Sequence, residues 1–166
     1  LGWELHMPSS ACLDVYKTLM KHGKRHNIIN YGSFAMNVMR MEKGFKGASE
    51  LTNEVTLPEA NVMKFVDTTK NFLGKDKTLS DINNLPWLCV YLAIESNDTE
   101  DGNGGEAVLN EGRLVGSIVS IVYSHTVKKI LAFAYVKPEA SKPNTTLEVI
   151  IADQSRKAIV LSEAAY

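Results

Sequence analysis

The chain of 166 residues has few cysteines and no long apolar run. Its two cysteines, Cys12 and Cys89, do not form a Cys-x-x-Cys pair, which excludes a disulfide framework and a thiolate metal site. A reducing compartment fits, either the cytoplasm or, in a eukaryote, the mitochondrial matrix. No stretch approaches the roughly 18 apolar residues of a membrane span, and no signal peptide is visible at the N-terminus. We therefore expect a soluble protein without a membrane partner.

An excess of charge is also missing, because 18 Lys and Arg face 19 Asp and Glu. This balance gives no electrostatic footprint for nucleic acid. The histidines, including His6 and His125, lack partners at metal-ligand spacing, so we expect no metal site. The acidic stretch 97–106 lacks the spacing of an EF-hand and is interpreted as a solvated hairpin turn. The chain also lacks the common phosphate-loop, dinucleotide and nucleophile-elbow motifs.

The N-terminal half predicts an α+β arrangement. Residues 3–7 alternate apolar and polar side chains up to Pro8, which is typical of a half-buried strand. A helix capped by Ser9 or Ser10 should end at Gly23, and a second helix should run from Ser33 to a left-handed cap at Gly44. A short strand is predicted at 62–66. Because the chain starts with Leu1 in what reads as the interior of a strand, we expect a fragment of a longer protein.

From Pro86 onward the pattern predicts only strands. They are expected at 87–95, 106–110, 113–124, 130–136, 146–152 and 157–163, with a bulge at Gly116 and a turn at 153–156. Six short strands favour a small antiparallel barrel, because closure removes exposed edges. The predicted core of this barrel is Leu88, Val90, Leu92, Val115, Ile118, Leu131, Phe133 and Val149.

Two strings around the second helix resemble a family signature. Met39-Arg40-Met41-Glu42-Lys43-Gly44 and Thr56-Leu57-Pro58-Glu59-Ala60 are similar to the L-R-L-E-x-G and T-P-x-E-A patterns of the glycine-cleavage T-protein (aminomethyltransferase) superfamily. Later strings, among them Leu131-Ala132-Phe133-Ala134-Tyr135-Val136, resemble its dimethylglycine and sarcosine dehydrogenase branch. The chain departs from the family at Met36, where the T-protein has an arginine, and at Asn61 and Met63, where glycines are usual. Asn61 is tolerable because asparagine adopts left-handed backbone readily.

The resemblance implies a fold and a division into domains. Residues 1–82 would be the C-terminal part of a folate-binding aminomethyltransferase domain, and residues 83–166 the C-terminal β-barrel domain. The whole is α+β followed by all-β, with the boundary near residues 80–85.

The resemblance also implies tetrahydrofolate as the cofactor and a methylated amine as the substrate of the parent protein. Gly2-Trp3-Glu4 matches the last three positions of the family's G-E-x-G-[YFW]-E segment, so Glu4 would grip the pterin, with Trp3 and His6 on the same strand. A carboxylate suits the two adjacent N–H donors of a pterin. Arg40 would contact the glutamyl tail, although an arginine at a helix end also commonly braces a carboxylate or the last carbonyls.

No catalytic residue is assigned in this chain, because the family's aspartate and any FAD domain would lie upstream of Leu1. The chain alone is expected to be inactive, and the unpaired strand at 3–7 is expected to cause self-association. Two other functions stay open. One is a regulatory or interaction protein that keeps the fold without turnover, and the other is a folate-dependent demethylase.

Overall fold

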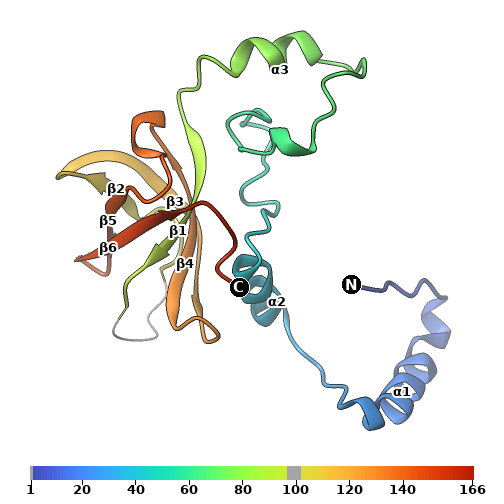
Figure 1. Ribbon diagram of the computed structural model, residues 1–166. Helices are drawn as coiled ribbons and strands as arrows, with labels where there is room; N and C mark the ends of the chain where they lie inside the picture. The colour runs from blue at the N-terminus through green and yellow to red at the C-terminus, as the bar shows by residue number, and fades with distance from the viewer. Residues whose placement is uncertain (1, 97–101) are drawn as a thin grey trace. The chain divides into compact units, whose positions relative to one another are not determined.

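The computed structural model describes residues 2–96 and 102–166 (Figure 1). Contacts between Cα atoms divide the chain into two compact units, Leu1–Ala35 and Met36–Tyr166, and each is described by itself. Part of the predicted hairpin turn, residues 97–101, lies outside the described residues.

The first unit consists of irregular chain and helix. Residues 2–8 form no strand, so the strand predicted at 3–7 is wrong. A strand needs a hydrogen-bonded neighbour, and the described part of this unit offers none. The 3₁₀ turn η1 (Ser9–Ala11) leads into α1 (Cys12–Gly23), which ends at the predicted glycine, and η2 (Lys24–His26) follows. No side chain of α1 is buried, so its apolar stripe is not covered within this chain.

The helix α2 (Ser33–Glu42) begins and ends close to the predicted positions. Its end is a Schellman motif, in which the amide of Phe45 donates to the carbonyl of Arg40 (2.8 Å) and the amide of Gly44 to that of Met41 (2.9 Å). Gly44 has a φ of +65°, a conformation that costs glycine little. The last turn of α2 therefore stops where the sequence predicted, with its carbonyls satisfied.

The segment after this motif is mostly turns. The strand predicted at 62–66 is wrong, because the 3₁₀ turn η3 (Met63–Phe65) occupies the position. A short helix, α3 (Lys75–Asp81), was not predicted. It is only two turns long and mostly polar, so it carries little hydrophobic periodicity. Asn61 has a φ of 55°, which confirms that asparagine supplies the left-handed backbone where the family usually has glycine.

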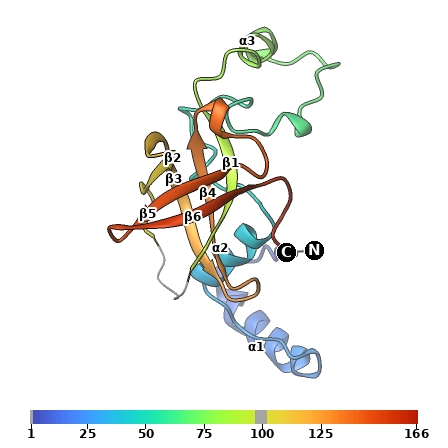
Figure 2. The same cartoon turned by 60° about the vertical axis from the view of Figure 1, so that its left-hand side comes forward.

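Six antiparallel strands form a closed barrel in the order β1-β4-β3-β2-β5-β6, which confirms the predicted architecture (Figures 1 and 2). The strands are β1 (Leu88–Ile94), β2 (Ala107–Asn110), β3 (Arg113–Ser124), β4 (Lys129–Val136), β5 (Thr146–Ile151) and β6 (Gln154–Leu161). The strand β6 starts three residues before its predicted start. The reason is a two-residue turn at Ala152 and Asp153, both with positive φ, which pairs Ile151 directly with Gln154.

The bulge predicted near Gly116 is present in β3. Val108 pairs with Gly116 but the next residue, Leu109, pairs with Leu114, which leaves Val115 as the extra residue. A Cβ atom on Gly116 would lie 2.1 Å from the carbonyl oxygen of Tyr135. Only glycine allows the backbones of β3 and β4 to approach this closely.

The barrel has two apolar clusters rather than one. Val90, Leu92, Val115, Ile118 and Val149 lie in the interior cluster, as predicted. Leu131 and Phe133 are also buried, but in a second cluster with Met41 of α2, Cys89, Tyr91 and Val122. Leu88 is only partly buried. Residues of β1 and β4 therefore alternate between the barrel interior and a face covered by the end of α2.

Candidate functional site

The predicted pterin-binding residues lie in the irregular chain of the first unit. The carboxylate of Glu4 is 87% exposed and its Oε2 lies 3.5 Å from Nε2 of His6, whose side chain is 89% exposed. Trp3 is 85% exposed. The structure thus brings Glu4 and His6 together and leaves the Glu4 oxygens and the Trp3 ring accessible to a ligand.

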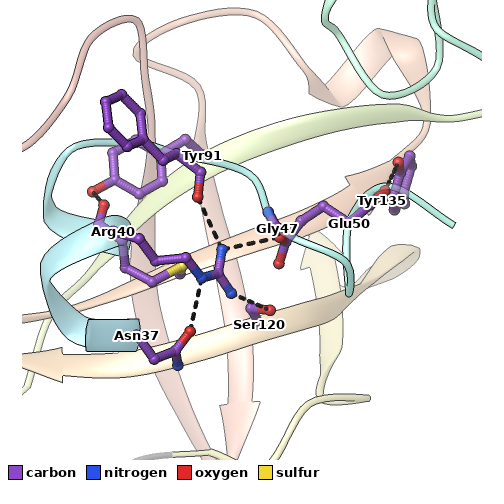
Figure 3. Close-up of polar contacts among 9 residues, drawn as sticks. Asn37, Arg40, Gly47, Glu50, Tyr91, Ser120 and Tyr135 are labelled. Atoms are coloured by element: carbon purple, nitrogen blue, oxygen red, sulfur yellow. Dashed lines mark hydrogen bonds and ion pairs between the residues drawn. The ribbon is translucent and has the colours of Figure 1, made fainter. Parts of the chain in front are cut away.

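Arg40 belongs to the second unit and makes hydrogen bonds within it (Figure 3). Its Nε donates to Oδ1 of Asn37 (2.8 Å), and its Nη1 donates to the carbonyl of Phe45 (2.9 Å) and to Oε2 of Glu50 (3.0 Å). Its Nη2 donates to Oγ of Ser120 in β3 (3.2 Å). These bonds use most of the five guanidinium donors. They match the bracing role that an arginine at a helix end commonly has.

Glu50 is the buried partner of this arginine. Its side chain has no exposed surface, whereas that of Arg40 is 21% exposed. Its Oε2 also accepts the amide of Gly47 at 2.6 Å, and its carbonyl accepts the hydroxyl of Tyr135 at 2.7 Å (Figure 3). The second carboxylate oxygen, Oε1, is buried without a hydrogen bond. A buried carboxylate needs a cation and donors, so Arg40 and Gly47 fix the loop 44–50 against the barrel.

A second set of contacts joins α2 to the barrel. Oγ of Ser124 donates to Oε1 of the buried Glu42 at 2.6 Å, and the hydroxyl of Tyr91 donates to the carbonyl of Met41. Burial raises the pKa of Tyr91 to about 12, and the nearby charge of Glu42 acts in the same direction. Burial likewise raises the pKa of the Cys89 thiol to about 12, and it raises the pKa of Tyr135. These groups are therefore neutral near pH 7 and serve as hydrogen-bonding or packing groups.

The T-x-P-E-A string forms a capping box that docks on the barrel. The amide and the hydroxyl of Thr56 both donate to Oε2 of Glu59 at 2.7 Å, and the amide of Glu59 faces Oγ1 of Thr56 at 3.4 Å. The carbonyl of Glu59 then accepts the amide of Cys89 at 2.7 Å, and the side chain of Asn61 donates to the Cys89 carbonyl at 3.3 Å. The string is thus a clamp on the first strand of the barrel.

Two hollows adjoin this segment. One, of about 570 Å³, is lined by apolar side chains, by Phe45 and Phe65, and by Lys43, Lys46 and Lys64. The other, of about 690 Å³, lies at the barrel wall beside Trp87 and Gly116 and includes Glu54, Glu59 and Lys137. Both volumes are within the range of small-molecule sites.

The contacts of Glu50, Ser120 and Tyr135 were not anticipated from the sequence. Ser120 and Arg40 are 80 residues apart, and Glu50 lies in a stretch without periodicity. Glu42 could have been noticed, because it belongs to the helix-end string and falls on an otherwise apolar turn. Within the described residues, no group of three metal-ligating side chains is found, and no helix there is long and apolar enough to cross a bilayer.

Comparison with known proteins places this geometry in a family. The model of the GCVT N-terminal domain matches residues 1–70, and that of the glycine cleavage T-protein C-terminal barrel domain matches residues 89–166. The chain belongs to the glycine-cleavage T-protein superfamily. The boundary predicted near 80–85 falls in the interval that neither model matches and stays a prediction.

The curated relatives of the superfamily include dehydrogenases and aminomethyltransferases. Mitochondrial dimethylglycine dehydrogenase of Homo sapiens is 33% identical over 98% of this chain and 19% of its own length. Mitochondrial sarcosine dehydrogenase of Mus musculus is 29% identical over 86% of this chain and 16% of its own length. The aminomethyltransferase of Thermoanaerobacter pseudethanolicus is 25% identical over 99% of this chain and 45% of its own length. The chain therefore spans less than half the length of each of these relatives.

A solved structure has the same fold. The crystal structure of glycine cleavage system aminomethyltransferase T from Bartonella henselae superposes with a TM-score of 0.70, covering 80% of this chain and 38% of that protein. The two sequences are 16% identical, so this likeness concerns the fold.

Proposed function

We propose that this chain is part of a tetrahydrofolate-dependent one-carbon transfer module in a protein of the dimethylglycine or sarcosine dehydrogenase type. The observation that carries the proposal is the 33% identity to dimethylglycine dehydrogenase along 98% of the chain. The proposed substrate of the whole protein is a methylated amine. Its oxidation would be the work of an FAD domain outside this chain. The compartment would be the mitochondrial matrix, or the cytoplasm in a bacterium.

Bound tetrahydrofolate would accept the one-carbon unit, and the residues of this chain would bind and orient it. The groups at the N-terminus fit that task chemically. Glu4 offers a carboxylate whose printed contact is His6 rather than a buried cation, so its oxygens can accept the paired N–H donors of a pterin. Trp3 offers an exposed ring for stacking against the heterocycle.

Arg40 has a different place in this proposal. Its guanidinium is engaged by Asn37, Glu50, Ser120 and the Phe45 carbonyl, so it acts as a positioning residue for the loop 44–50. The Schellman end of α2 and the Thr56–Glu59 capping box hold the rest of this segment on the barrel. The segment is thereby fixed as a rigid wall for a ligand.

The test is a titration of tetrahydrofolate against the intact protein and its Glu4→Gln variant. Glutamine keeps the shape but removes the charge and turns one acceptor into a donor. Binding should weaken by about 1.5 to 3 kcal/mol, or roughly ten- to a hundred-fold. Oxidation of the amine should change much less.

The matched control is Glu139→Gln, which changes an exposed glutamate of the barrel. It should leave the affinity for tetrahydrofolate unchanged. Equal affinities of the wild-type protein and Glu4→Gln would show that Glu4 is a surface residue and would remove the site from the proposal.

A further inference from the structure

Because Arg40 is engaged by internal contacts, the acidic end of a folate needs other cations, and one hollow supplies them. Lys43, Lys46 and Lys64 all line the hollow of about 570 Å³ between the end of α2 and residues 51–65. In the part of the chain that the structure describes, no salt bridge joins any of the three to a carboxylate. Three unpaired ammonium groups around one hollow attract an anion.

Each of these ammonium groups lies over an aromatic ring. Nζ of Lys43 is 4.7 Å from the ring centroid of Tyr166, and Nζ of Lys46 is 5.2 Å from that of Phe133. Nζ of Lys64 is 5.0 Å from the ring centroid of Phe65. A cation–π contact orients a lysine without using all three of its N–H donors, so donors remain for an anionic ligand.

The walls of the hollow are apolar and aromatic. Phe45 is 66% exposed and Phe65 is 77% exposed, and Leu51 and Leu57 complete the apolar lining. Among the described residues that line the hollow there is no Asp or Glu. The site therefore fits an aromatic body that carries carboxylates, and it lacks the acceptor that a pterin requires.

We propose that this hollow binds the aminobenzoylglutamate end of the folate through Lys43, Lys46 and Lys64. This inference rests on the proposed function, since it assigns the acidic end of the same cofactor. The benzoyl ring lies against the apolar wall, and the glutamate carboxylates accept hydrogen bonds from the lysines. The pterin end is left to the N-terminal carboxylate, so the two ends are recognised by groups of opposite charge.

The probe is 4-aminobenzoyl-L-glutamate, which lacks the pterin, titrated against the intact protein by calorimetry. Replacing Lys43, Lys46 and Lys64 together by Gln should weaken its binding about ten-fold or more, since each lysine–carboxylate pair contributes modestly. The matched control replaces Lys128, Lys129 and Lys142, which are exposed lysines of the barrel, by Gln. The control removes the same charge and should keep the wild-type affinity.

Two further measurements separate the site from general attraction of anions. Raising NaCl from low to high concentration should weaken the wild-type protein but hardly affect the variant that lacks the three pocket lysines. ATP, an anion with a different body, should not displace the probe. Equal affinities of the two triple variants, or displacement by ATP at similar concentrations, would overturn the inference.

Tetrahydrofolate itself distinguishes the inference from the proposed function. If both hold, Glu4→Gln and the pocket variant each weaken tetrahydrofolate, and their effects multiply in the combined protein. If only Glu4→Gln weakens it, the lysine pocket is wrong and the proposed function stands. If aminobenzoylglutamate binds through the lysines but tetrahydrofolate binding ignores Glu4, the pocket stands and the pterin site is wrong.

Discussion

Removing the guanidinium of Arg40 should strongly destabilise the second unit. In Arg40→Met the side chain keeps much of its apolar length, while the fully buried carboxylate of Glu50 loses its cation and keeps only the Gly47 amide. One of its oxygens already lacks a partner, so the remaining charge has little compensation. Breaking a buried pair in this way costs about 3 to 5 kcal/mol.

A double-mutant cycle tests the physical reason for this loss. Glu50→Gln alone should cost less than Arg40→Met, because a neutral amide remains buried in place of a charge. Adding Glu50→Gln to Arg40→Met should recover stability, with a coupling of about 1 to 3 kcal/mol. Arg40→Lys should lie between the wild type and Arg40→Met, since lysine keeps the charge but not the fork that reaches Phe45 and Ser120 together.

The assay is urea unfolding followed by far-UV circular dichroism, with the fluorescence of Trp87 as a second probe beside the barrel. The midpoints of the variants should rank in the order wild type, Arg40→Lys and Arg40→Met. A loss below about 1 kcal/mol in Arg40→Met, together with a coupling near zero, would refute the reasoning, because an ion pair of that size belongs to an exposed surface.

Three other outcomes are expected. Gly116→Ala should cost more than about 3 kcal/mol or prevent folding, because the new Cβ would meet the Tyr135 carbonyl at 2.1 Å. Gly112→Ala should cost only about 1 kcal/mol, since it has a φ of +74° but open space around it, and equal losses in urea unfolding would argue against the close approach. Burial raises the pKa of Tyr91 to about 12 from 10.0, so the folded state retains a proton that the unfolded state releases. Stability should therefore fall as the pH rises through 10 towards 12, and Tyr91→Phe should flatten that slope in unfolding curves measured across this range. Finally, the exposed apolar side chains of the first unit should cause concentration-dependent self-association in sedimentation velocity, and a single monomeric species at high concentration would speak against it.

The sequence determined the elements whose signals are local. Gly44 stops α2 because glycine adopts positive φ at little cost, and this can be read without any partner in view. The six strands were visible because apolar residues and turn signals alternate along the chain, and closure follows from the need to protect edges. Gly116 marked the bulge for the same local reason, since a strand interior rarely contains glycine.

The tertiary structure decided everything that depends on a partner. Residues 3–7 have a strand pattern but form no strand, because no neighbouring strand lies in the described part of the first unit. Leu131 and Phe133 were expected in the barrel interior, yet the end of α2 buries them on the other face of the sheet. The role of Arg40 was left open between a ligand and a carboxylate, and its contacts with Glu50 and Ser120 emerge only when segments far apart in the chain meet. Periodicity records which face is apolar, but only packing determines what covers it.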